Sequence, residues 1–214
     1  MAGVEGGAVN ATLEHIARKY SIDLGQKSPI RLPQIQRPEF ARLFNELGFV
    51  RGAEIGVAQG HHAKLIFEAN PTMRLLCVDI WDLYDGYNEY TDRIHRYYRE
   101  AQERLAPYNV RFIKNFSMDA LKDAPNDLDF VYIDGAHDFK NVAMDICEWS
   151  KKVRVGGIVA GHDYKHSYRK GYPVEVKHVV QAFCYVRGIH PWFVMDRPGN
   201  EAWFYVRQEG DRLI

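Results

Sequence analysis

Residues 53–69 read AEIGVAQGHHAKLIFEA, and this stretch decides the fold class. Its apolar first part, Ala53 to Val57, predicts a short buried strand. Gly56 and Gly60 then let the backbone turn sharply and approach a ligand closely. Apolar residues recur at helical spacing in the last part and predict a helix from Ala63 to Ala69. The stretch therefore predicts a unit of strand, glycine turn and helix.

The same alternation continues on both sides of this unit. Further strands are expected at Leu75–Ile80, Val110–Ile113, Leu128–Ile133 and Gly157–Ala160, and helices at Glu39–Leu47, Asn88–Leu105, Ser117–Leu121, Phe139–Val153 and Val174–Val186. Strands joined through helices form right-handed crossovers and a parallel sheet with helices on both faces. The expectation is an α/β fold with about seven strands.

The end of the chain breaks the alternation. Trp192–Met195 and Ala202–Val206 are strand-like, and only the turn residues 196–200 separate them. A parallel pair needs a crossover of about a dozen residues, so these two strands are predicted to pair antiparallel. The sheet is therefore expected to end in an antiparallel hairpin.

The 214 residues fit one domain with appendages. Residues 1–38 are expected to hold a covering helix from Asn10 to Tyr20, followed by an extended connector. The connector contains three prolines, which are barred from a helix interior. Residues 39–208 would then form the domain, and residues 209–214 a tail.

The composition excludes several classes of protein. Lys and Arg number 28 and Asp and Glu number 28, so no overall field attracts nucleic acid. No stretch approaches the roughly 20 apolar residues of a membrane span, and the first residues lack the basic flank and apolar core of a leader. The three cysteines are widely separated and predict reduced thiols. A cytoplasmic protein without nucleic-acid or membrane partners is expected, and a homo-oligomer stays open.

Polar side chains are predicted where the strands end, which is where an open α/β sheet binds its ligand. Asp79 ends the second strand about 20 residues after the glycine turn, a spacing at which an acid accepts hydrogen bonds from ribose hydroxyls. Its alternative role is to cap the following segment. The dinucleotide fingerprint G-x-G-x-x-G is absent because Ala58 stands where the second glycine belongs, which disfavours a nicotinamide cofactor. We expect a ligand that contains adenosine.

Four motifs together resemble a known family. They are Glu54-Ile55-Gly56-x-x-x-Gly60, the strand-end Asp79, Tyr132-Ile133-Asp134-Gly135-x-His137, and Gly156-Gly157 ahead of Gly161-His162-Asp163-Tyr164. From Phe40 to Arg207 the chain resembles the class I S-adenosylmethionine-dependent methyltransferases, and within them the small-molecule O-methyltransferase branch. The resemblance implies a Rossmann-like methyltransferase fold whose last strand runs antiparallel.

The resemblance also implies which residues hold the methyl donor, S-adenosylmethionine. These are Glu54, Gly56, Gln59 and Gly60 for the methionine part, Asp79 for the ribose, Ser117 and Met118 for the adenine, and also Ile80 and Asp134. A serine at the start of a helix is equally typical of a helix cap, so the role of Ser117 stays open.

Asp134 and Asp163 are expected at the same end of neighbouring strands, about 4.8 Å apart. Two carboxylates so close need a cation or a shared proton, and Mg²⁺ is a natural oxygen-bound cation. The resemblance implies an acid–amide or acid–acid pair where this chain has His162-Asp163. Because an imidazole favours Mn²⁺, Fe²⁺ or Zn²⁺, the identity of a metal held by Asp134, His162 and Asp163 stays open. His61 and His62 are interpreted as a polar helix start.

Methyl transfer to a hydroxyl needs a group that takes the hydroxyl proton. His137 is the first candidate base, His162 the second and His166 the third, with Asp134 beside them. His137 has the alternative role of capping the helix that follows. Aromatic residues after the second and fifth strands predict a ring-shaped small molecule or glycan as acceptor. They are Trp81, Tyr84, Tyr87, Tyr90, Tyr164, Tyr168 and Tyr172.

The expected function is S-adenosylmethionine-dependent methylation of a hydroxyl oxygen on a small molecule or glycan, with divalent-metal assistance. Two rivals stay open. One is a nicotinamide-dependent oxidoreductase. The other is a methyltransferase-like binding module that holds the nucleoside without turnover, a reading that the unusual His162-Asp163 pair motivates.

Overall fold

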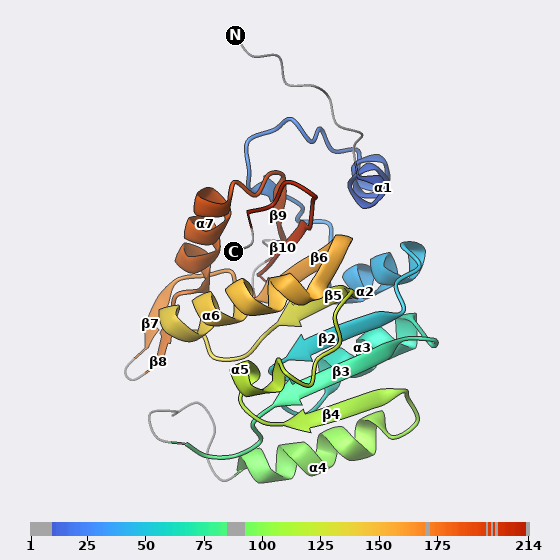
Figure 1. The fold of residues 1–214 in the computed structure, drawn as a ribbon, viewed down its shortest axis with the longest axis vertical. Coiled ribbons are helices and arrows are strands. Elements are labelled where there is room, and N and C mark those ends of the chain that lie inside the picture. Colours follow the sequence, from blue (N-terminus) through green and yellow to red (C-terminus); the bar gives the residue numbers. More distant parts are fainter. Residues whose placement is uncertain are drawn as a thin grey trace.

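The described part of the chain folds around one large β-sheet with helices on both faces (Figure 1). The structure is a computed structural model, and it describes residues 10–84, 93–169, 172–195, 197, 199 and 201–212. Among these residues the sheet has eight strands in the order β1-β9-β10-β6-β5-β2-β3-β4. The predicted α/β fold with a mostly parallel sheet is confirmed.

The helices and strands follow one another as the alternating pattern predicts. The strands of the large sheet are β1 (Ile30–Arg31), β2 (Arg51–Ile55), β3 (Arg74–Asp79), β4 (Val110–Lys114), β5 (Leu128–Ile133), β6 (Val153–His162), β9 (Trp192–Met195) and β10 (Ala202–Val206). The helices are α1 (Ala11–Tyr20), α2 (Arg37–Glu46), α3 (His61–Ala69), α4 (Arg93–Leu105), α5 (Ser117–Ala120), α6 (Phe139–Trp149), the 3-10 turn η1 (Ser150–Lys152) and α7 (Val176–Arg187). A separate hairpin pairs β7 (Ser167–Arg169) with β8 (Tyr172–Val174).

Two hydrophobic cores lie on the two faces of the sheet. On one face, α1, α2 and α3 bury side chains such as Leu13, Phe40 and Phe67. On the other face, α6 and α7 bury side chains such as Ile146 and Val180. Strands covered on both faces carry apolar residues at nearly every position. This explains why the central strands appear in the sequence as continuous apolar runs.

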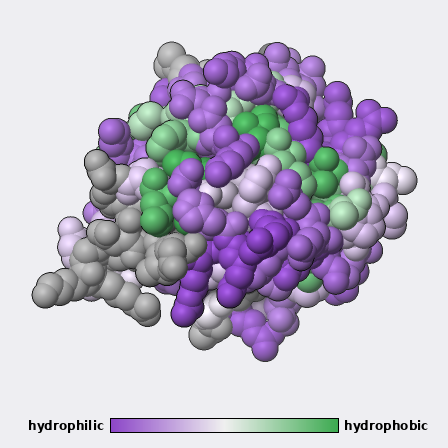
Figure 2. Space-filling model, turned by 90° about the horizontal axis from the view of Figure 1, so that it is seen from below, coloured by the Kyte–Doolittle hydropathy of each residue, from purple (hydrophilic) through white to green (hydrophobic). Residues whose placement is uncertain are grey.

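The surface seen from below in Figure 2 is mostly hydrophilic. Helix α4 lies at this end of the molecule in Figure 1, and its buried residues are Ile94, Ala101 and Leu105, so its charged residues face outward. No helix in the described ranges combines the length and apolar character that a membrane span requires.

The predicted terminal hairpin is confirmed, since β10 pairs antiparallel with both β9 and β6. Turn residues 196, 198 and 200 lie outside the described residues. Within the described ranges the sheet has eight strands rather than the expected number of about seven. The difference is β1, which pairs parallel with β9. The backbone N–H groups of an extended connector need hydrogen-bond acceptors, and strand β9 supplies them. For example, the N–H of Leu32 donates to the carbonyl oxygen of Val194 at 2.8 Å.

Several element ends differ from the prediction. Helix α2 begins at Arg37 rather than Glu39, because Pro38 fits the first turn of a helix. Helix α6 ends at Trp149, and Val153 begins β6 instead of closing the helix. The expected start of α4 at Asn88 lies outside the described residues. The division of the chain at residue 38 stays a prediction.

The sheet order reverses between β2 and β5. From β2 the chain proceeds outward to β3 and β4, and it then returns to place β5 and β6 on the other side of β2. In such sheets the ligand binds beyond the carboxyl ends of the strands at the reversal. At Gly56, which follows β2 with φ +82°, an added Cβ would lie 2.1 Å from the carbonyl oxygen of Asp134 after β5. The two strand ends are therefore in direct contact at the expected ligand crevice.

Candidate active site

A pocket of about 320 Å³ opens at the carboxyl ends of β2, β3 and β5. Nine of the residues expected to bind the donor or a metal or to act as the base line it: Glu54, Gly56, Gln59, Asp79, Ile80, Ser117, Asp134, His137 and Asp163. Three others lie elsewhere. Gly60 packs against Leu105, Met118 packs against the core, and His162 lines a small neighbouring cavity together with Asp134 and His137.

The glycine turn after β2 is held by the carboxylate of Asp79. Asp79 Oδ2 accepts hydrogen bonds from the backbone N–H groups of Val57 at 2.9 Å and Ala58 at 2.8 Å, and Oδ1 accepts one from Trp81 at 3.0 Å. Burial raises the pKa of Asp79, and these backbone donors oppose that rise. Ala58 has φ +47°, so an L-residue occupies the left-handed conformation at this turn. Asp79 thus organises the turn, and it also lines the pocket.

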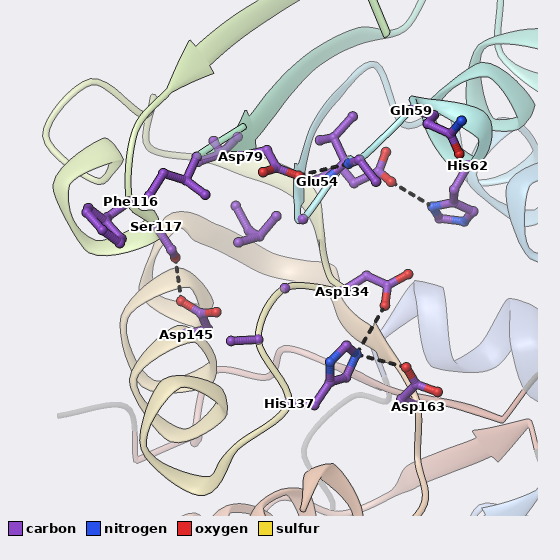
Figure 3. Close-up of a pocket in the computed structure, with 18 of the residues that line it drawn as sticks. Glu54, Gln59, His62, Asp79, Phe116, Ser117, Asp134, His137, Asp145 and Asp163 are labelled. Atoms are coloured by element: carbon purple, nitrogen blue, oxygen red, sulfur yellow. Dashed lines mark hydrogen bonds and ion pairs between the residues drawn. The ribbon is translucent and has the colours of Figure 1, made fainter. Parts of the chain in front are cut away.

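The wall of the pocket formed by the end of β2 and by α3 holds a buried acid and a buried imidazole. Glu54 is 1% exposed, and its Oε1 lies 3.4 Å from His62 Nδ1 (Figure 3). Burial raises the pKa of Glu54, which His62 opposes. The ring of His62 packs on that of Tyr132 with centroids 4.1 Å apart. His61 and His62 begin α3, as expected, but His62 is buried on the inner face of the helix and is therefore more than a polar helix start.

Arg37 reaches the same wall from α2. Its Nη2 lies 3.5 Å from Asp134 Oδ2, and Arg37 lines the pocket. In the sequence this residue falls within the expected extended connector. No local pattern distinguishes it there, because only the packing of α2 on the sheet brings it to the strand ends.

The opposite end of the pocket is formed by Ser117 and Asp145. Ser117 Oγ donates to Asp145 Oδ1 and accepts a hydrogen bond of 2.7 Å from Trp149 Nε1. Burial raises the pKa of Asp145 to about 7, which the hydrogen bond from Ser117 opposes. Ser117 makes no capping hydrogen bond at α5, so the helix-cap alternative is wrong. Asp145 was missed, although its position beside Val142, Ile146 and Trp149 on the buried face of α6 is a signal that could have found it.

A cluster of ionisable side chains lies where the pocket meets the ends of β5 and β6 (Figure 3). His137 Nε2 lies 2.8 Å from Asp163 Oδ2 and 3.8 Å from Asp134 Oδ1. Lys165 Nζ lies 2.5 Å from Asp163 Oδ1. Burial disfavours charge on both partners, but hydrogen bonds outweigh it: they raise the pKa of His137 to about 10 and hold the pKa of Asp163 well below its usual range.

The protonation of His137 bears on its expected roles. With a pKa of about 10, His137 carries a proton at neutral pH and donates to Asp163 rather than standing as a ready base. The capping alternative for His137 is wrong, because Asp138 caps α6 through the backbone N–H of Asn141. The third candidate base, His166, lies outside the pocket and stacks on His178 with ring centroids 4.4 Å apart.

The side chains of Asp134, His162 and Asp163 lie close enough together to share a metal ion. Their ligand atoms all lie within 4.8 Å of one another. Two carboxylate oxygens and one imidazole nitrogen suit a first-row divalent cation. Asp163 has φ +52°, a conformation that Asp adopts more readily than most residues. The donors fit a metal, although His137 and Lys165 already neutralise Asp163 in this arrangement.

The aromatic residues expected at the rim of the pocket lie in different environments. Tyr84 lines the pocket, whereas Trp81 is fully buried and donates from Nε1 to the carbonyl oxygen of Ala58 at 2.7 Å. Tyr164 is buried, and Tyr168 is 78% exposed. Outside the described part of the chain are Tyr87, Tyr90 and the side chain of Tyr172.

Comparison with known proteins identifies a family for this chain. The family model described as "Methyltransferase domain" matches residues 53–164, which is more than half of the 214 residues. No curated protein sequence matches the chain.

Solved structures share the fold at low sequence identity. Cofactor-bound Rv0187 from MTB is 17% identical with a TM-score of 0.61, covering 92% of this chain and 90% of that one. An O-methyltransferase from Bacillus cereus in complex with SAH is 14% identical, with a TM-score of 0.57 and coverage of 92% and 90%. The O-methyltransferase TomG from Streptomyces achromogenes, in complex with SAM, is 15% identical, with a TM-score of 0.57 and coverage of 95% and 92%. From the match over residues 53–164, the chain belongs to the methyltransferase domain family.

Proposed function

We propose that this protein transfers a methyl group from S-adenosylmethionine to a hydroxyl oxygen of a small molecule or glycan. The observation that carries the proposal is the pocket itself. It runs from Glu54 and the glycine turn, past Asp79, to Ser117 and Asp145, and it opens on Asp134 and His137. The same cavity thus contains a cleft long enough for a nucleoside and, at its mouth, the carboxylate of Asp134 and the imidazole of His137.

The residues of the pocket fit the donor. Glu54 Oε2 is buried and has no hydrogen-bond partner among the described residues, which is the state expected of a group that binds a ligand. The close approach at Gly56 leaves no room for a side chain and brings the backbone to the pocket floor. When bound, S-adenosylmethionine supplies an electrophilic methyl group, so the protein's main task is to orient an acceptor oxygen toward it.

The cluster at the ends of β5 and β6 faces the acceptor side in this proposal. Asp134 and the imidazole of His162 are the groups assigned to hold and receive the hydroxyl proton, while the protonated imidazole of His137 holds Asp163. A divalent cation held by Asp134, His162 and Asp163 would lower the pKa of the acceptor hydroxyl.

Thermal unfolding with different ligands tests this proposal. S-adenosylhomocysteine at 100 times its dissociation constant should add about 2.7 kcal/mol to the free energy of unfolding, and NADH should add nothing. Stabilisation by NADH alone would identify a nicotinamide-dependent enzyme and contradict the proposal. A second assay offers S-adenosylmethionine with a labelled methyl group and a library of hydroxyl compounds. Binding of the nucleoside without transfer to any of them would identify a binding module instead.

A further inference from the structure

A second cavity, of about 240 Å³, lies at the opposite ends of the strands that carry the pocket. In Figure 1 these are the ends of β2, β3 and β4 away from the arrowheads. Three exposed arginines line the cavity, Arg51 of β2, Arg74 of β3 and Arg111 of β4. Leu76 and Leu128 also line it and are buried. The cavity therefore combines three cations with an apolar base.

The three arginines belong to one face of the sheet. Arg51 is the neighbour of Arg74 in the parallel register of β2 and β3, and Arg111 is the neighbour of Leu76 in that of β3 and β4. Because side chains alternate between the two faces of a strand, all three arginines share the face on which Leu76 is buried. Like charges at neighbouring positions of paired strands destabilise a sheet. Folding therefore gains nothing from the paired charges of Arg51 and Arg74, which points to a role in binding.

No carboxylate forms an ion pair with these arginines within the part of the chain that the structure describes. Asp129 accepts a hydrogen bond from the backbone N–H of Arg51, but its other oxygen lies 2.8 Å from Arg154 Nε. Arg111 Nη1 donates to the backbone carbonyl oxygen of Asp123 at 3.1 Å, and a carbonyl leaves the guanidinium charge in place. The cavity thus keeps a local positive charge and free guanidinium donors.

We propose that this cavity binds a small organic phosphate, with the phosphate group among the three arginines and the apolar part of the ligand against the buried leucines. Guanidinium groups form forked, charge-assisted hydrogen bonds with phosphate oxygens, and several of them can share one phosphate. A doubly charged phosphate would also offset the repulsion between Arg51 and Arg74. The site is separate from the pocket beside Asp79 and does not depend on the proposed methyl transfer.

The surroundings of the cavity favour a small ligand over a nucleic acid. Asp123 and Asp127 are exposed, and they stand two residues on either side of Pro125, which lines the cavity. Their charges disfavour a long chain of phosphates, whose binding depends on many cations in a row. The chain as a whole has no net charge to add to the attraction. One phosphate group, in contrast, needs only the three arginines.

An NMR titration of the ¹⁵N-labelled protein with phenyl phosphate tests this inference. For so small a ligand, a dissociation constant of about 1 mM is expected. The backbone amide signals of Arg51, Arg74 and Arg111 should shift, whereas those of Gly56 and Asp134 should stay in place. Inorganic phosphate should bind about fivefold more weakly or worse, because it has no apolar part to bury.

A charge-removing substitution separates binding from folding. Arg74→Gln should weaken phenyl phosphate binding by about tenfold or more, because it removes charge-assisted hydrogen bonds. The same variant should keep or raise the urea midpoint, since it also removes a repulsion, and a purely structural role of Arg74 would lower that midpoint. Arg99→Gln is the matched control, because Arg99 is exposed on α4 and its loss should change the dissociation constant by less than about twofold. If Arg74→Gln does not fold, Arg51→Gln gives the same test.

Several results would overturn the inference. They are the absence of binding at about ten times the expected dissociation constant, shifts confined to Gly56 and Asp134, and an equal loss of affinity in Arg74→Gln and Arg99→Gln. Tighter binding of a short single-stranded RNA that Arg74→Gln abolishes would assign the surface to nucleic acid and also overturn it. Binding of S-adenosylhomocysteine is measured separately, so the proposed function stands or falls on its own.

Discussion

Asp79 Oδ2 accepts a hydrogen bond of 2.8 Å from the backbone N–H of Ala58, so the acid that ends β3 holds the turn that follows β2. From the sequence, Asp79 is expected to accept hydrogen bonds from the ribose hydroxyls of the ligand. The structure adds a role in folding, because both carboxylate oxygens already accept backbone hydrogen bonds. The two roles make different predictions for the protein without ligand.

Asp79→Asn should destabilise the protein even when no ligand is present. The amide nitrogen of Asn cannot accept a hydrogen bond, so at least one buried backbone donor loses its acceptor. The expected loss is about 2 kcal/mol in the free energy of unfolding, measured by urea denaturation. Asp82→Asn is the control, since Asp82 lies in the same loop and is 50% exposed. An unchanged midpoint for Asp79→Asn would mean that Asp79 serves only the ligand.

Gly56→Ala should be far more damaging than Gly48→Ala. Both glycines have positive φ, +82° and +68°, so both substitutions carry the backbone penalty of an L-residue. Only at Gly56 would the new Cβ collide with the backbone of Asp134, whereas nothing lies within 4 Å at Gly48. Thermal unfolding should show a loss of about 1 kcal/mol for Gly48→Ala and a loss several times larger for Gly56→Ala. Equal losses would argue against the close contact of the two strand ends.

The pKa of Asp145 predicts a pH-dependent stability. Burial raises this pKa to about 7, above its usual value. The unfolded chain then releases the proton first, so the contribution of Asp145 is greatest below about pH 4 and is lost as the pH rises to about 7. Asp145→Asn should remove this loss, which is on the order of a few kcal/mol. Urea denaturation of both proteins at pH 5 and pH 8 measures the difference, and parallel pH profiles would show that Asp145 does not titrate in this range.

Metal assistance predicts a thermal response to Mn²⁺ that requires Asp163. At 100 times its dissociation constant, Mn²⁺ should stabilise the wild type by about 2.7 kcal/mol, and EDTA should reverse the effect. Asp163→Asn should abolish the response, because one of the three ligands is lost. The exposed Asp119 provides the control, Asp119→Asn. Methyl transfer that continues unchanged in EDTA would count against any metal at this site.

The layers of the fold could be predicted because they are written in local patterns. The apolar runs of β2 and β5 and the helical spacing in α3 are each visible within about ten residues. Strand β1 could not be predicted, since two residues, Ile30 and Arg31, show no periodicity. Only their pairing with β9, far along the chain, makes them a strand.

Residues of the candidate site could be predicted where an acidic residue stands at or directly after an apolar strand. Glu54, Asp79 and Asp134 follow strands and could be placed at one edge of the sheet. Arg37 gave no signal, because its approach to Asp134 depends on how α2 packs. Asp145 is a third case. It is an acid on the apolar face of α6, and this pattern in the sequence could have predicted a buried polar site.

A crystal structure of the protein soaked with S-adenosylhomocysteine tests the central claim most directly. We predict electron density for the ligand along the ends of β2 and β3, with the sugar beside Asp79 and the base beside Ser117. A pocket that stays empty at a saturating concentration of S-adenosylhomocysteine, or a ligand bound away from the ends of β2 and β3, would contradict the account.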